Sequence, residues 1–252
     1  MKHTDEYEGL VAETVMVTGA DGDLIHAYHA RPLVPGPFPG IVLFHHRPGW
    51  DSWYRSTTRL FAAHGYSAIC PDLFCRVGHG EPDDVAATAR AAGGVSDSQV
   101  VGDAAGCVRL LRSHPSSNGK VGLFGTCSGG RHAYLAACRL DDIGVLVDCW
   151  GGNVVASDDA LTPAQPFAPA SMSDRLTAPV LGLFGGEDHN PTPDDVNALE
   201  EILRKLGKSY EFHRYPDAGH GFFYHDRPSA YRAEAAVDGW SKVWPFLDRH
   251  LS

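Results

Sequence analysis

The chain contains the segment Lys120-Val-Gly-Leu-Phe-Gly-Thr-Cys-Ser-Gly-Gly130, which predicts a short buried strand that turns abruptly into a helix. Cys127 lies at the tip of the turn, with Gly125 and Gly129 two residues to either side. A bend this sharp leaves no room for a Cβ atom at the flanking positions. The first backbone N–H groups of the helix favour a thiolate and can hold an oxyanion. The segment therefore predicts a nucleophilic cysteine, and a buried structural cysteine in a Gly-rich turn is the alternative.

Two later segments offer an acid and a base. Asp188 ends an apolar run and a Gly-Gly turn in Ala178-Pro-Val-Leu-Gly-Leu-Phe-Gly-Gly-Glu-Asp188, and His220 lies between two glycines in Ala218-Gly-His-Gly-Phe222. The order nucleophile, acid, histidine, each on a loop after an apolar strand, is the order of α/β-hydrolases. Because sites in open α/β sheets gather at the carboxyl ends of the strands, we expect the three side chains to converge.

The rest of the chain alternates strands with helices. Strands are expected at 13–18, 24–30, 41–44, 67–70, 121–125, 144–150, 180–184 and 210–215, and helices at 54–64, 97–113, 129–140, 192–206 and 228–250. This alternation predicts an α/β fold with a mostly parallel central sheet, helices on both faces and an N-terminal antiparallel hairpin. We expect a single domain over 1–252, with a polar loop at 76–84 and a low-complexity Ala-rich stretch from there to residue 94. The segment 151–173 is a candidate lid or pocket wall, and a tolerated surface loop is the alternative.

Composition narrows the class of protein. A chain of 252 residues with 43% hydrophobic and 21% charged residues is typical of a soluble globular domain. The net charge of −10 argues against nucleic acid or an anionic membrane as partner. The six cysteines form no Cys-x-x-Cys pair, which favours reduced thiols in the cytoplasm. The first eight residues lack the apolar core of a signal peptide, and no run of 18 apolar residues could span a bilayer.

The chain resembles the dienelactone hydrolase family over about residues 13–250. The resemblance is carried, in order along the chain, by Pro71-Asp-Leu-Phe-Cys-Arg76, Gly125-Thr-Cys-Ser-Gly-Gly130, Gly185-Gly-Glu-Asp188 and Ala218-Gly-His-Gly-Phe222. The Gly-x-Cys-x-Gly-Gly elbow is the specific part, because most α/β-hydrolases carry serine there. The resemblance implies a cofactor-free hydrolase that cleaves a small lactone or carboxylic ester. We expect a monomer or small homo-oligomer whose partner is that small molecule.

The chain departs from the family at two positions. In the family, a Glu after the third strand contacts the resting cysteine, and the segment His45-His-Arg-Pro-Gly49 places His46 there. An imidazole cannot replace a carboxylate in that scheme, so we expect a direct Cys–His pair. The family also holds the substrate carboxylate with two arginines, of which Arg76 matches one and Tyr224 stands in place of the other. The departures indicate a less charged or more aromatic substrate.

The catalytic roles follow from the chemistry of the three side chains. Cys127 attacks the acyl carbon as a thiolate and forms an acyl-enzyme that water resolves. His220 takes the thiol proton and later activates the water. Asp188 fixes the imidazole tautomer, with its neighbour Glu187 as the fallback.

The oxyanion donors are expected to be backbone N–H groups. Ser128 is the rival nucleophile, but the glycine spacing centres on Cys127, so Ser128 should begin the helix and donate its N–H. The second donor should come from the loop after strand 41–44. Arg47 is chosen there because Pro48 has no N–H.

We expect five side chains to contact the substrate: His46, Arg76, Trp150, Phe222 and Tyr224. For Arg76 the alternative is a solvated loop residue, and each aromatic ring alone is more often core. No metal site is expected, because the histidine pairs lack i,i+4 spacing and an acidic cluster.

Two other functions stay open. The same triad could act on another activated carbonyl, by C–C cleavage, amide hydrolysis or isomerisation, or the chain could be a non-catalytic thiol sensor or ligand-binding relic.

Overall fold

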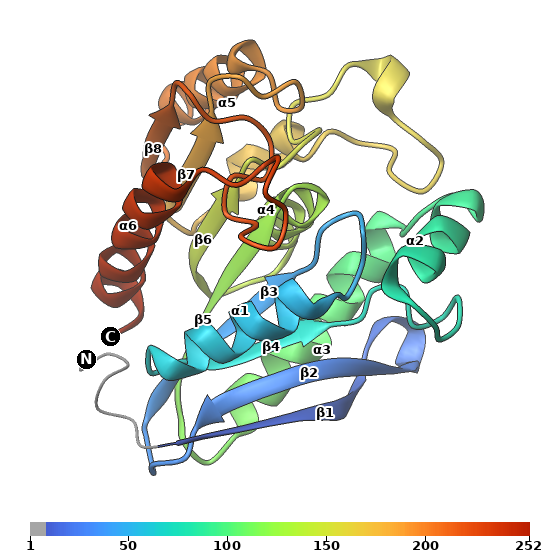
Figure 1. The fold of residues 1–252 in the computed structure, drawn as a ribbon, viewed down its shortest axis with the longest axis vertical. Helices are drawn as coiled ribbons and strands as arrows, with labels where there is room; N and C mark the ends of the chain where they lie inside the picture. The colour runs from blue at the N-terminus through green and yellow to red at the C-terminus, as the bar shows by residue number, and fades with distance from the viewer. Residues whose placement is uncertain (1–8) are drawn as a thin grey trace.

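The computed structural model describes residues 9–252, so the segment on which the signal-peptide prediction rests lies outside the described residues. Within the described residues, eight strands form one sheet in the order β1-β2-β4-β3-β5-β6-β7-β8 (Figure 1). The strands are β1 Leu10–Thr18, β2 Leu24–Pro32, β3 Phe38–Phe44, β4 Ser67–Pro71, β5 Ser117–Thr126, β6 Ile143–Cys149, β7 Val180–Gly185 and β8 Tyr210–Tyr215. The helices are α1 Ser52–Ala63, α2 Pro82–Ala91, α3 Asp97–Ser113, α4 Ser128–Arg139, α5 Pro193–Lys205 and α6 Ala233–Leu251, with 3-10 helices η2 Ala20–Gly22, η3 Asp158–Ala160 and η4 Pro169–Arg175.

Most of the sheet is parallel. Strand β2 pairs antiparallel with both β1 and β4, and every pair from β4 through β3 and β5 to β8 is parallel. The predicted α/β class, with its mostly parallel sheet and N-terminal antiparallel hairpin, is confirmed. Because β3, β5, β7 and β8 run in the same direction, the loops that follow them lie at one edge of the sheet.

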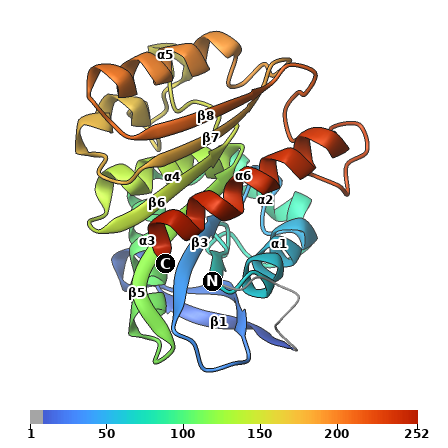
Figure 2. The ribbon, with the colours of Figure 1, turned by 90° about the vertical axis from the view of Figure 1, so that its left-hand side faces the viewer.

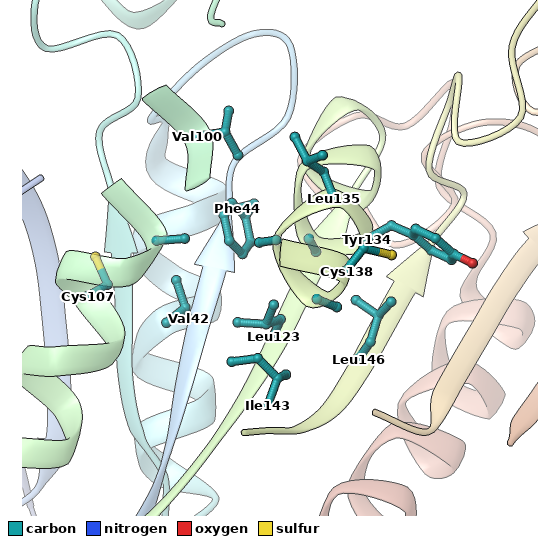
Figure 3. Close-up of a cluster of buried hydrophobic side chains, with 14 of the residues drawn as sticks. Val42, Phe44, Val100, Cys107, Leu123, Tyr134, Leu135, Cys138, Ile143 and Leu146 are labelled. Atoms are coloured by element: carbon teal, nitrogen blue, oxygen red, sulfur yellow. The ribbon is translucent and has the colours of Figure 1, made fainter. Parts of the chain in front are cut away.

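Helices cover both faces of the sheet (Figure 2). Ile41 and Leu43 of β3 face α1 and α6, while Val42 and Phe44 face α3 and α4. Side chains alternate between the two faces of a strand. Because helices bury both faces of this sheet, the central strands are continuous apolar runs. Figure 3 shows the apolar core on the side of the sheet that α3 and α4 cover, with side chains from both helices and from β3, β5 and β6.

Two elements differ from the expectation. The loop expected at 76–84 ends earlier, because α2 begins at Pro82, carries Asp83 and Asp84 in its first turn and continues through the Ala-rich stretch. Both features favour a helix start, because proline is pre-organised there and acids complement the dipole. The last helix begins at Ala233 and not at residue 228, since the backbone of Arg232 is extended and its N–H bonds the Phe222 carbonyl at 3.2 Å.

The segment 151–173, expected to be a lid or pocket wall, is tied to its surroundings. The backbone N–H of Asp97 donates to the Ala164 carbonyl at 2.9 Å. Arg131 of α4 donates to the Phe167 carbonyl at 3.0 Å. These bonds attach the segment to the starts of α3 and α4. None of the helices within residues 9–252 is long and apolar enough to cross a membrane.

Candidate active site

Cys127 occupies the single residue between β5 and α4. Its backbone has φ 57° and ψ −128°, a conformation that side-chain-bearing residues rarely adopt. A Cβ atom at Gly125 would lie 2.0 Å from the carbonyl oxygen of Gly129, and one at Gly129 would lie 1.9 Å from that of Phe44. The structure therefore has the sharp bend that the glycine spacing predicted, with the sulfur at the carboxyl edge of the central strand.

His220 and Asp188 meet at the same edge. The Nδ1 atom of His220 lies 2.9 Å from Oδ2 and 3.2 Å from Oδ1 of Asp188. The Asp188 side chain is only 2% exposed, whereas that of His220 is 38% exposed. A buried carboxylate bonded to Nδ1 holds the proton on that nitrogen and leaves Nε2 for the nucleophile. The His220 side chain also hydrogen-bonds that of Cys127.

The charges of the pair reinforce one another. Burial by itself raises the pKa of the Cys127 thiol, but the hydrogen bond to His220 and the charge of His220 lower it below its usual value. Burial lowers the pKa of His220, but hydrogen bonds to Asp188 and Cys127 outweigh it and raise that pKa to about 10. Both shifts favour the thiolate–imidazolium form of the pair over the thiol–imidazole form.

Two backbone N–H groups point at the sulfur. Those of Ser128 and Arg47 both bond Cys127 and lower its pKa further. Ser128 is the first residue of α4, and Arg47 lies on the loop after β3. The structure thus brings together the two groups expected as oxyanion donors, one from a helix start and one from a neighbouring loop.

A buried histidine fixes the Arg47 loop. His45 is 1% exposed, and burial lowers its pKa to about 4, so its ring is neutral. Its Nε2 accepts from the Leu73 N–H at 3.1 Å, which leaves Nδ1–H to donate to the His46 carbonyl at 2.9 Å. The ring therefore connects the loop to the segment after β4 and holds the Arg47 N–H in place.

His46 begins a chain of polar contacts that leads to Arg227 through Asp51. Its Nε2 lies 2.6 Å from Oδ2 of Asp51, which also accepts from Arg227 at 3.2 Å. Burial lowers the pKa of His46, and its Nδ1 has no partner among the described residues. Asp51 caps α1 by accepting from the Tyr54 N–H. Sequence reasoning missed Asp51 and Arg227. The capping position was readable as an acid just before a helix, but nothing local marks Arg227.

Arg76 does not face this site as a free cation. Its guanidinium makes a bidentate pair with Asp103 of α3, at 2.9 Å to each oxygen, and a third bond of 2.8 Å to Asp23. Asp103 is fully buried and holds the arginine against the η2 turn. The expectation that Arg76 anchors a substrate carboxylate stays a prediction, and α3 supplies a competing carboxylate, Asp103, that the motif did not reveal.

The aromatic residues expected to contact the substrate are deeply placed. Trp150 and Phe222 are both fully buried, with ring centroids 4.5 Å apart, and the Trp150 ring lies 6.4 Å from that of His220. The Trp150 ring therefore packs between Phe222 and His220, and neither aromatic ring is exposed at the surface. Tyr224 is 3% exposed, and its ring lies 4.8 Å from that of His46.

The other cysteines differ from Cys127. Burial raises the pKa of the four fully enclosed thiols, which are Cys70, Cys107, Cys138 and Cys149. Cys75 is half-buried, and its pKa is also raised. Cys127 is thus distinguished from the other five by a lowered pKa. Within residues 9–252, no group of three His, Cys, Asp or Glu side chains is placed to hold a metal ion.

Known proteins resemble the chain over nearly its whole length. The model described as "Dienelactone hydrolase family" matches residues 25–251. A protein of Methylorubrum extorquens named "Putative carboxymethylenebutenolidase" is 34% identical over 93% of this chain and 80% of its own. A Bradyrhizobium protein named "Probable 2-oxo-3-(5-oxofuran-2-ylidene)propanoate lactonase" is 30% identical over 92% of each chain. The crystal structure of a "Putative Dienelactone Hydrolase" from Klebsiella pneumoniae has a TM-score of 0.84 at 28% identity and covers 94% of this chain and 97% of that one.

Proposed function

The chain belongs to the dienelactone hydrolase family, and we propose that it cleaves a small lactone or carboxylic ester with Cys127 as nucleophile. The observation that carries the proposal is the convergence on one sulfur atom of the His220 side chain and two backbone N–H groups. A structural cysteine needs none of these groups, whereas a thiolate that attacks a carbonyl needs all of them.

In the first half of the reaction, the Cys127 thiolate attacks the acyl carbon. The carbonyl oxygen becomes an oxyanion and accepts hydrogen bonds from the N–H groups of Ser128 and Arg47. When the tetrahedral intermediate collapses, the carbon–oxygen bond breaks, and the leaving oxygen takes a proton from the His220 imidazolium. The product of this half is a thioester on Cys127 and a neutral imidazole.

In the second half, water resolves the thioester. The Nε2 atom of His220 takes a proton from water as the water oxygen attacks the acyl carbon, and the carbon–sulfur bond then breaks to release the acid and the thiolate. Asp188 keeps the Nδ1 proton in place throughout. The resting thiolate–imidazolium pair is restored without a cofactor.

The site favours a substrate of low charge. Arg76 is held by Asp103, and Arg227 is paired with Asp51 and lies over the Tyr224 ring at 5.1 Å. Neither guanidinium is available to a substrate carboxylate without breaking an ion pair. We therefore propose that a neutral ester or lactone is a better substrate than an anionic dienelactone.

The test compares hydrolysis of a dienelactone and of a neutral aryl ester by the wild type and Cys127→Ala. Cys75→Ala is the matched control, because Cys75 is the other cysteine that is not fully buried. Turnover that is lost in Cys127→Ala and kept in Cys75→Ala supports the proposal. Turnover that survives in Cys127→Ala and disappears in Ser128→Ala would move the nucleophile to Ser128. No turnover of either ester by the wild type would contradict the proposed substrate class.

A further inference from the structure

Three buried hydroxyl groups lie in a row beside the nucleophile. The Tyr54 Oη atom, from α1, lies 2.7 Å from the Thr126 Oγ1 atom at the end of β5. The same Thr126 oxygen lies 2.5 Å from the Tyr224 Oη atom, from the loop after β8. Tyr54 and Thr126 are fully buried and Tyr224 is 3% exposed, so bulk water does not serve these groups. Thr126, the middle member of the row, immediately precedes Cys127 in the chain, and the row ends at Tyr54 and Tyr224.

Counting protons shows that one of them is not used within the row. Three hydroxyls carry three protons, and the two contacts between them need one proton each. One hydroxyl therefore donates to a group outside the row, or leaves a buried proton without an acceptor. An unpaired buried donor is costly, so the position of the third proton matters.

The backbone decides the direction of the row. The Thr126 N–H donates to the Tyr54 oxygen at 3.2 Å, so Tyr54 is an acceptor in that contact. If Thr126 Oγ1 also donated to Tyr54, the Tyr54 proton would have no acceptor among the described residues. With Tyr54 donating to Thr126, and Thr126 donating to Tyr224, every contact is satisfied. The unused proton is then on Tyr224, which is the phenol whose pKa the charge of Cys127 raises.

The surroundings of Tyr224 fix the phenol close to Cys127. Its ring packs edge-to-face against His46 and Trp53, each with centroids 4.8 Å apart. Cys127 packs against the same apolar cluster that contains Tyr224. Burial raises the pKa of Tyr224 well above its usual value, and the charge of Cys127 raises it further, so the phenol remains a donor.

We propose that the Tyr224 hydroxyl donates a hydrogen bond to the Cys127 sulfur, as a third donor beside the backbone N–H groups of Ser128 and Arg47, and that Tyr54 and Thr126 orient it. The inference rests on the proposed function, because it assigns a role around the same nucleophile. A neutral phenol stabilises the thiolate without attracting a substrate carboxylate, whereas a cation at this position would do both. The residue thus links activation of the nucleophile to the preference for an uncharged ester.

The test measures the pKa of the Cys127 thiol without any substrate. Thiolate absorbance at about 240 nm and the rate of alkylation by iodoacetamide are followed against pH, with Cys127→Ala as the blank. Tyr224→Phe keeps the ring and removes the donor, and we expect the Cys127 pKa to rise by about one to two units, the size of a hydrogen bond to a charged group. An unchanged pKa in folded Tyr224→Phe would overturn the proposal.

Tyr134→Phe is the matched control for loss of a buried hydroxyl. The Tyr134 hydroxyl bonds that of Ser173 at 2.7 Å on the opposite layer of the sheet, away from the row. We expect its removal to leave the Cys127 pKa unchanged. An equal rise in Tyr134→Phe and Tyr224→Phe would show a general packing effect and would overturn the proposal.

A second variant changes the donor without removing it. Incorporation of 3-fluorotyrosine at position 224 makes the phenol more acidic with almost no change in size, so a stronger donor should lower the Cys127 pKa. A purely structural role for Tyr224 predicts no such fall, and its absence in the folded protein would overturn the proposal. Because the titration needs no turnover, a failed ester assay with shifted pKa values would contradict the proposed function alone.

Discussion

The Nδ1 atom of His220 lies 2.9 Å from the Oδ2 atom of Asp188, 32 residues earlier in the chain. Asp188→Asn should keep the shape of the site but remove the charge that favours the imidazolium. We expect kcat/KM for a neutral aryl ester to fall by about 10²–10⁴-fold. Glu187→Gln is the control, since the neighbouring Glu187 is exposed and should be replaceable without loss. Equal losses in the two variants would contradict the assignment of Asp188.

The opposite pKa shifts of Cys127 and His220 define a pH window for activity. The thiolate forms as pH rises through the lowered pKa of Cys127, and the imidazolium is lost as pH rises through about 10. We expect kcat/KM measured from about pH 5 to 11 to rise and then fall, with its plateau between these values. Protonated His220 also stabilises the folded state, because its pKa is higher there than in the unfolded chain. This stabilisation is complete below the unfolded pKa of about 6.5 and is lost as pH rises through about 10. A single rise near the pKa of a free thiol, with no fall, would argue against the pair.

Arg76 should matter for stability and not for the substrate. Arg76→Ala leaves the fully buried carboxylate of Asp103 without its bidentate partner, and we expect the free energy of unfolding to drop by about 3–5 kcal/mol. Chemical denaturation checks this value, with Arg204→Ala, from an exposed pair with Glu201, expected to leave the free energy of unfolding nearly unchanged. KM for an anionic ester should stay unchanged below the melting temperature. A selective rise in that KM would return Arg76 to the substrate site.

Asp148 makes stability depend on pH. It is fully buried at the end of β6, where Oδ1 accepts from the Gly151 N–H at 2.8 Å and Oδ2 has no partner among the described residues. Burial raises its pKa to about 7, against the opposing effect of the Gly151 bond. The folded state therefore keeps a proton that the unfolded chain loses near pH 4, so stability falls as pH rises from about 4 to 7.

Asp148→Asn cannot ionise and should remove this loss. We expect the variant to gain stability over the wild type, on the order of 4 kcal/mol above pH 7 and little at pH 4. Urea unfolding at the two pH values measures the difference. Asp141→Asn, at an exposed carboxylate, is the control and should show the same small difference at both. A constant gain for Asp148→Asn would contradict the raised pKa.

Local chemistry made the elbow and much of the fold predictable. The close approach at Gly125 involves Gly129, only four residues away, and apolar runs such as β6 and β7 are visible in any short window. The missed contacts join distant positions. Tyr54 and Thr126 are 72 residues apart, and Asp51 and Arg227 are 176 apart. A motif also gives the position of a residue in the chain and not the partner of its side chain. The motif around Arg76 therefore did not reveal its pairing with Asp103.

His220 follows an edge strand of the sheet. Within residues 9–252, β8 pairs with β7 alone, and its side chains are mostly half-exposed, whereas Cys127 follows the central strand β5. Strands with few buried contacts open at lower free energy than the core. On warming, His220 should therefore separate from the sulfur before the rest of the sheet unfolds. The highest temperature at which the protein is active is then set by the stability of the edge strand β8. Substitutions that stabilise β8 would raise this temperature without any change at Cys127.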